Sequence, residues 1–271
     1  MKAIEIRKRF DQLDSLRSTL DSTLQDVERY VVPYRGEFFN TEMSAEQEIN
    51  CRRRGIFDST APIAADVLAS RIHSNLTSPM IAWFHLWFRN TAWNTTVGAK
   101  EWLETVEDQI WQTLKESDFN MEIAETYLDL VSFGTAVLFQ EELKDDDWAG
   151  LTFTAMPVVD CYFEHGADDK VLRVYRRLRM TYLQLQDKFP DHDFGDMSDD
   201  PDTKHIVVFC VYRRDGIKEG QSKLLAPEAR PWGYKYVLHR SSEQLDEGGY
   251  YQMPAHVVRW KKVSGSRWGH S

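Results

Sequence analysis

The main change in the hydrophobic period of the chain comes close to Gly134. Before that residue, apolar side chains recur mostly at spacings of three, four or seven with charged residues between them, which is typical of amphipathic helices. After it, the period falls to two in short runs separated by polar turns, which is typical of strands. Helices first and strands second favour an α+β fold, with N-terminal helices followed by a β-rich half, over a repeated βαβ unit.

Spacing alone indicates three helices in the first half. The longest is expected over about residues 2–30, with an apolar face of Ile6, Phe10, Leu13, Leu20, Leu24 and Val27. At 1.5 Å per residue it would be a rod of about 40 Å, which either lies across its own domain or packs on a neighbouring subunit. The other two are expected over about residues 98–116 and 120–133, and Gly134 ends the second of them.

A fourth helix is predicted within residues 57–79. Asp58, Ser59 or Thr60 is a suitable N-cap, Pro62 stands where a first-turn proline is tolerated, and Pro79 ends the segment. The apolar face expected to enter the core consists of Ile63, Val67, Leu68, Ile72 and Leu76.

The stretch "MIAWFHLWF", residues 80–88, is predicted to be a strand that is covered on both faces. Large apolar residues occupy both alternating sets, with Trp83 and Trp87 on one side and Phe84, Leu86 and Phe88 on the other. The second cover would come either from another layer of the same domain or from another subunit.

Six strands are expected beyond Gly134, over residues 135–143, 151–156, 160–165, 170–180, 205–214 and 234–240. One short helix interrupts them. It opens with a capping box formed by Thr181 and Gln184 and closes near Pro190.

The charge balance argues against general DNA binding. The chain has 33 Lys and Arg against 43 Asp and Glu, a net charge of −10, whereas a protein that grips many phosphates usually has the opposite balance. Its three cysteines, Cys51, Cys161 and Cys210, lie far apart, which fits a reducing compartment. No stretch is apolar enough for a membrane span and the N-terminus is too charged for a signal peptide, so we expect assembly in a cytoplasm without membrane partners.

Chemical motifs give no candidate for catalysis, a metal or a cofactor. The acidic loop 191–202 misses the EF-hand spacing, and the three aspartates 145–147 are better explained as a hairpin tip. No nucleophile elbow or P-loop is present, and His73 and His85 have no carboxylate at a readable spacing. The chain is therefore predicted not to be an enzyme.

Two groups of arginines are open to two readings. The run 52–54 is either a solvated charge cluster or a phosphate or partner site. In the strand 170–180, Arg173, Arg177 and Arg179 share a face and Arg176 takes the other, so the strand is not one clean basic surface. Ion pairing with the excess of carboxylates is favoured there over phosphate contact.

Four blocks of sequence carry a resemblance to a known family. They are "RYVVPYRGEFF", "RRRGIFDSTAPIAADVLASRIHSNLTSPMIAWFHLWF", "FNMEIAETYLDLVSFGTAVLF" and "MPAHVVRWKKVSGSRWGHS". In this order they resemble the head-to-tail connector, or portal, proteins of short-tailed phages, from about residue 26 to the last residue. The family's closing block appears here as Arg259, Trp260, Gly265, Trp268, Gly269 and Ser271, with Trp268 where tyrosine is usual. The positions singled out as family motif or possible subunit interface are Phe57, Asp58, Arg71, Trp83, Phe84, Trp87, Arg259, Trp260 and Gly269.

The resemblance implies a structural role in the virion. Portal proteins form a ring, usually of twelve subunits, at one capsid vertex, through which double-stranded DNA is packaged and ejected without sequence-specific binding. Their partners are other copies of themselves, the terminase motor, capsid and scaffold proteins, and tail proteins. The alternatives are a virion adaptor or scaffolding protein and a metal-dependent phage enzyme.

The resemblance also suggests how the chain is divided. Residues 1–56 would be an N-terminal helix and polar connector, 57–135 a helical wing core with the aromatic strand, and 136–264 the β-rich part of the wing. Residues 265–271 would begin the stem, which is absent here, so we expect a fragment or a truncated gene product. Without stem helices, this chain is predicted to be monomeric or weakly associating.

Overall fold

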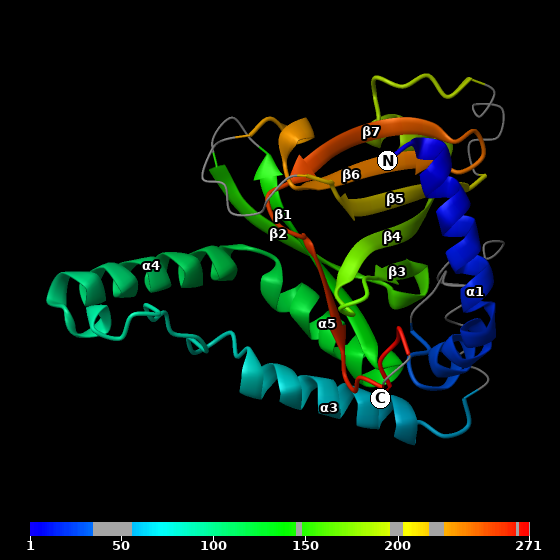
Figure 1. Cartoon of the computed structure of the whole chain (residues 1–271). Helices are drawn as coiled ribbons and strands as arrows, with labels where there is room; N and C mark the ends of the chain where they lie inside the picture. The colour runs from blue at the N-terminus through cyan, green and yellow to red at the C-terminus, as the bar shows by residue number, and fades with distance from the viewer. Residues whose placement is uncertain (35–55, 145–147, 196–202, 217–224, 264–265, 271) are drawn as a thin grey trace.

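The structure is a computed structural model, and it describes residues 1–34, 56–144, 148–195, 203–216, 225–263 and 266–270. Helices precede strands along the chain, as the change of period predicts, and the fold is α+β (Figure 1). The helices are α1 (Ala3–Tyr30), α3 (Thr60–Leu76), α4 (Val97–Glu116), α5 (Phe119–Phe133) and α6 (Tyr182–Lys188), with short 3-10 turns at Trp93–Thr95, Val158–Asp160 and Pro227–Ala229. All five α-helices fall where the sequence predicts them.

The strands form two antiparallel sheets. The smaller has the order β2-β1-β8, with β1 (Thr135–Lys144), β2 (Trp148–Met156) and β8 (Ala255–Arg259). The larger has the order β3-β4-β5-β6-β7, with β3 (Cys161–His165), β4 (Val171–Met180), β5 (His205–Arg213), β6 (Trp232–Leu238) and β7 (Glu243–Tyr250). The six predicted strands are confirmed, and β7 and β8 were not predicted.

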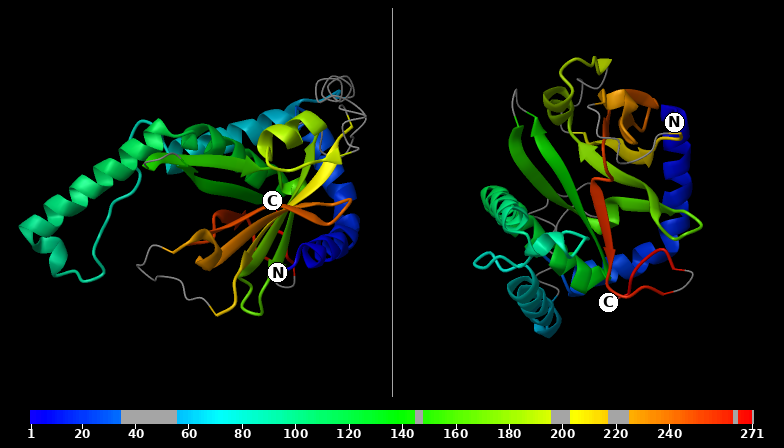
Figure 2. Two further views of the ribbon diagram at one scale, coloured as in Figure 1. Left: turned by 90° about the horizontal axis from the view of Figure 1, so that it is seen from above. Right: turned by 60° about the vertical axis from the view of Figure 1, so that its left-hand side comes forward.

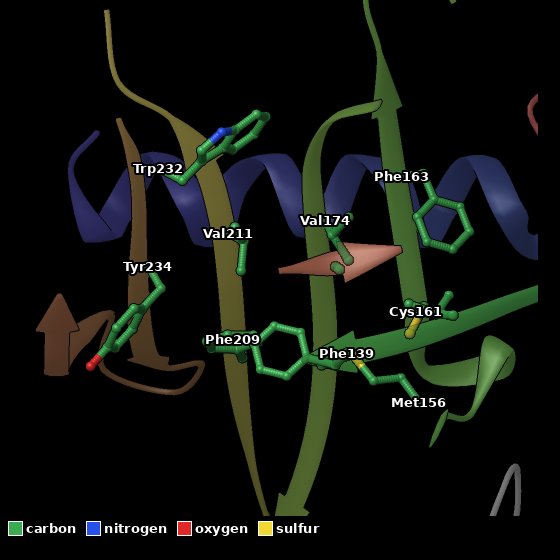
Figure 3. Close-up of a cluster of buried hydrophobic side chains, with 11 residues drawn as sticks. Phe139, Met156, Cys161, Phe163, Val174, Phe209, Val211, Trp232 and Tyr234 are labelled. Carbon is green, nitrogen blue, oxygen red and sulfur yellow. The ribbon is translucent and has the colours of Figure 1, made fainter. Parts of the chain in front are cut away.

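The main core lies between the two sheets. Phe139 and Met156 of the small sheet meet Phe163, Val174 and Phe209 of the large one (Figure 3). This arrangement buries apolar side chains from the inner face of each sheet, which is the main favourable contribution to folding.

Helices cover the outer faces of both sheets. Helix α1 places Ile6, Phe10 and Leu13 on the outer face of the large sheet, against Tyr162 and Tyr175. It therefore lies across its own domain, one of the two alternatives that its length left open. On the other side, α5 covers the small sheet, where Phe119 and Ile123 pack on Leu138 and Phe153.

Helix α4 and the segment before it project from this layered body. We call residues 77–116 the arm: an extended segment leads out along one side and α4 returns (Figures 1 and 2). Helix α3 lies against α5 at the base of the arm. No residue of α4 is fully buried.

The predicted aromatic strand at residues 80–88 is wrong, because this segment is extended but pairs with no described strand. Two of its backbone N–H groups donate hydrogen bonds to side-chain oxygens, where a strand would donate to a neighbouring strand. The N–H of Leu86 donates to Glu107 Oε2 at 3.0 Å, and the N–H of Phe88 donates to Asn94 Oδ1 at 2.8 Å. One alternating set, which includes Phe84 and Phe88, is partly covered, and the other is exposed. Among the described residues no second layer of the same domain covers the exposed set, and cover by another subunit stays a prediction.

The predicted buried face of α3 is also wrong. The helix buries Pro62, Ala65 and Ala69 and exposes most of its large apolar residues: Ile63, Val67, Leu68 and Leu76. Apolar periodicity does not distinguish small from large side chains, and small side chains let α3 approach α5 closely. Its N-cap is Ser59, one of the three expected, and it ends at Leu76, before Pro79.

Candidate functional site

The described residues of the C-terminal block, 259–263 and 266–270, close the fold around the junction of α5 and β1. Arg259 Nη2 donates to Asp169 Oδ2 at 3.0 Å, and Lys262 pairs with the same carboxylate. Hydrogen bonds from Lys262 and Arg259 lower the pKa of Asp169 to about 2. Arg259 and Lys262 therefore connect the end of β8 to the turn that follows β3, because both bind the carboxylate of Asp169.

Gly269 lies where a side chain has no room. Its N–H donates to the buried Thr135 Oγ1 at 2.8 Å. A Cβ at this position would overlap the carbonyl oxygen of Gly134 and lie 3.0 Å from Arg259 Cβ. Gly134 caps α5 in the left-handed region with φ 71°, and its carbonyl accepts the N–H of Trp260 at 2.9 Å. The glycine of the family block thus permits a close backbone approach that fixes the chain end.

Polar contacts hold α1 on the large sheet. Buried Arg17 donates to Tyr162 Oη at 2.9 Å and to the carbonyl of Cys161 at 3.2 Å. Nearby, Glu164 accepts hydrogen bonds from Arg9 and from Arg173, the latter at 2.7 Å. Burial acts to raise the pKa of Glu164, but the hydrogen bonds from the two arginines outweigh it and the pKa is lowered. These contacts are structural.

Three of the four arginines of β4 form ion pairs, as the sequence favours, whereas Arg176 forms none among the described residues and its buried Nε has no hydrogen-bond partner there. Arg173 bonds to Glu164, while Arg177 and Arg179 each lie 3.2 Å from Asp160 Oδ1. Their charges are therefore satisfied within the domain and are not presented to phosphates. The arginine run 52–54 lies outside the described residues.

Within the described ranges, no group of three or more His, Cys, Asp or Glu side chains could hold a metal ion. In the acidic loop, Asp193 accepts the N–H of Gly195 at 3.0 Å; residues 196–202 and the aspartates 145–147 fall outside the described ranges. Burial raises the pKa of the Cys161 thiol to about 12, which leaves it unreactive. No described helix is long and apolar enough to cross a membrane.

Exposed apolar side chains concentrate on the arm and on α3. More than half of the large hydrophobic residues that the described structure exposes lie between residues 57 and 121: Phe57, Ile63, Val67, Leu68, Leu76, Met80, Ile81, Trp83, Trp87, Trp93, Val97, Trp102, Ile110 and Met121. Trp87 is 76% exposed. A concentration of exposed apolar side chains of this kind is typical of a site of protein–protein contact.

Aromatic stacking holds the arm in shape. Trp83 is 41% exposed and stacks on Phe119, with 6.1 Å between ring centroids. Phe84 meets Trp111 edge-on at 6.3 Å, and Phe88 stacks with Trp102 at 5.8 Å. In this region His85 Nδ1 lies 2.8 Å from Glu107 Oε1, and the N–H of Leu86 lowers the pKa of Glu107.

The singled-out residues fall into three groups. Trp83, Phe84 and Trp87 lie on the arm, and Arg259, Trp260 and Gly269 form the C-terminal block, where Trp260 is 48% exposed. Phe57, Asp58 and Arg71 are exposed residues in or just before α3. Of these, Asp58 Oδ1 accepts the N–H and hydroxyl of Thr60 at 2.9 and 2.6 Å.

Some surface residues were missed by the sequence analysis. The outward Ile63 and Val67 were assigned to the core, and Trp102 and Lys261 were not noted as interface candidates. One signal was available: in residues 60–69 only Asp66 is charged, and a helix that is apolar on nearly all sides is typical of burial on more than one side.

The candidate site is therefore a projecting arm with exposed apolar side chains on a two-sheet body, the kind of surface at which proteins make contact. The family of bacteriophage head to tail connecting proteins matches residues 3–271, and the chain belongs to this family. It is 24% identical over 268 residues to the portal protein of Salmonella phage epsilon15. The aligned region covers 94% of this chain and 46% of that protein. This chain thus spans about half the length of that relative.

Proposed function

We propose that the chain is the wing part of a portal protein, a subunit of a ring at one capsid vertex through which double-stranded DNA enters and leaves. The observation that carries the proposal is the large apolar surface of the arm and α3, which the described residues leave exposed, in a member of the connector family. A closed ring uses two different faces of each subunit, so such a surface is expected on every copy.

The charge distribution supports a conduit. Each phosphate contact must be broken as DNA moves, so a channel subunit is expected to offer few free cations. The net charge is −10, and Arg173, Arg177 and Arg179 are all engaged by carboxylates. The division into connector, wing core, β-rich wing and start of a stem belongs to this proposal, as do the contacts with the terminase motor, the capsid, scaffold and tail proteins, and assembly in the host cytoplasm.

In this proposal the protein makes and breaks no covalent bonds. Energy for packaging comes from a separate motor, and the chain guides the genome by contact alone. The family's structural character supports this role.

Negative-stain microscopy of the complete gene product that contains these residues tests the proposal. Closed rings with a central channel are expected. A product that stays monomeric at micromolar concentration, or that binds preassembled portals as an adaptor, would contradict it.

A further inference from the structure

The solvent-facing side of α4 carries an acidic stripe, and one exposed aromatic ring, that of Trp102, lies on the flank of the helix, where it stacks on Phe88. Glu101, Glu104 and Asp108 are spaced so that they share one side of the helix. Glu104 pairs with Lys100 at 3.6 Å, whereas Glu101 and Asp108 have no ion-pair partner among the residues that the structure describes. Trp102, which is 56% exposed, lies next in sequence to Glu101.

A second surface has the opposite charge. Residues 255–270 contain Arg259, Lys261, Lys262 and Arg267 and no Asp or Glu. Arg259 and Lys262 are held by Asp169, but Lys261 and Arg267 are exposed and, within the described structure, form no ion pair. Exposed apolar residues accompany them. We call this the C-terminal surface: Val258, Trp260, Lys261, Val263 and Arg267.

The two surfaces are suited to each other on different copies. Both combine exposed tryptophan with unpaired charge, and the charges are opposite in sign, so contact would bury the rings and pair the charges. The arm extends away from the body and from the C-terminus of its own chain (Figures 1 and 2), so its outer part is presented to a neighbour. A nucleic acid would be repelled by the carboxylates of α4.

We propose that the acidic stripe of α4, with the ring of Trp102 on its flank, docks on the C-terminal surface of the next copy. The contact is heterologous, because the arm of one copy meets a different face of its neighbour, and repetition closes a ring when the rotation allows it. The proposal rests on the ring function proposed above and identifies the two faces that meet. The paired tryptophans Trp102 and Trp260 are the expected centre of the contact, because tryptophan is enriched among residues that dominate binding.

Photo-cross-linking of the complete gene product maps the contact. A benzophenone amino acid replaces Trp102, and isotope-labelled and unlabelled copies are mixed so that cross-links between copies can be distinguished by mass. Cross-links between copies to peptides within residues 255–270 are expected. The same probe at exposed Leu183 on α6 is the matched control and is expected to give none there.

Charge reversal tests the electrostatic part. Glu101→Lys with Asp108→Lys, or Lys261→Glu with Arg267→Glu, should each weaken association by about tenfold or more, and combining all four should restore much of it. Reversal of exposed Asp215 and Glu228, which lie elsewhere, controls for net charge and should have little effect.

The outcomes separate this inference from the proposed function. Rings that form with cross-links elsewhere, or reversed variants that assemble as well as the wild type, overturn the inference and leave the ring function standing. A wild-type product that forms no ring contradicts the ring function, and this inference falls with it.

Discussion

Gly269→Ala tests the role of the C-terminal block in the fold. The added methyl group would overlap the carbonyl oxygen of Gly134, which is backbone and cannot rotate away. That carbonyl already accepts the N–H of Trp260 at 2.9 Å, and the N–H of Gly134 donates to the carbonyl of Leu130 at 3.0 Å, so the junction is held on both sides. Gly269 must therefore move.

The cost follows from what that movement breaks. Overpacking a well-packed site costs about 1–3 kcal/mol, and separating the Gly269 N–H from Thr135 Oγ1 leaves buried polar groups unpaired at about 1–3 kcal/mol. The two costs overlap, because movement that relieves the overlap is what strains the hydrogen bond. We expect a loss of about 2–4 kcal/mol in the free energy of unfolding, measured by urea denaturation of the 271-residue chain.

Gly98→Ala is the matched control. No atom lies within 4 Å of a Cβ built at Gly98, which is in the first turn of α4. Alanine there should leave the stability unchanged or raise it by up to about 1 kcal/mol. If Gly269→Ala changes the unfolding free energy by less than about 0.5 kcal/mol, the close approach at the C-terminal block does not stabilise the fold and the reasoning is refuted.

Two further changes test the arm and the α1 contacts. Trp83→Ala should lower the free energy of unfolding by about 1–2 kcal/mol, because Trp83 is only partly covered. Phe153→Ala, at a buried position, should lower it by about 3–5 kcal/mol. Equal losses for the two variants by urea denaturation would show that Trp83 belongs to the core. Glu164 has a pKa lowered in the folded state, so its contribution is present above the ordinary value and is lost as the pH falls through the folded value. Glu164→Gln should therefore destabilise the chain at pH 7 by about 1.5–3 kcal/mol and by less near pH 3, and a loss independent of pH would contradict the arginine contacts.

Local pattern was enough to predict most elements but not the last two strands. The capping box at Thr181 and the glycine stop at Gly134 lie within single segments, and both are confirmed. Strand β7, "EQLDEGGY", alternates poorly and contains two glycines. Gly248 lies directly opposite Tyr234 in the neighbouring strand β6, and a Cβ there would lie 2.6 Å from the ring of Tyr234. Alternation within a single strand does not reveal such a cross-strand contact.

The candidate site was predictable only in part, for a similar reason. The resemblance identified Arg259 and Gly269, but their partners Asp169 and Thr135 lie 90 and 134 residues away. The aromatic segment was recognised as rich in apolar side chains, while its backbone is satisfied by Glu107 and Asn94, residues with no strand signature.

The wrong prediction of the buried face of α3 bears on the proposed assembly. Ala65 and Ala69 face α5 and the larger Ile63 and Val67 face outward, the reverse of what burial of apolar area within one chain would favour. Packing the alanine side of α3 within the chain buries less apolar area than packing the side with Ile63 and Val67 would. It leaves these larger side chains available for contact with another protein. Such an exchange is stabilising only when a second protein surface covers Ile63 and Val67. The same argument holds for the exposed tryptophans of the arm, so the surplus of apolar surface supports the proposed contact between copies.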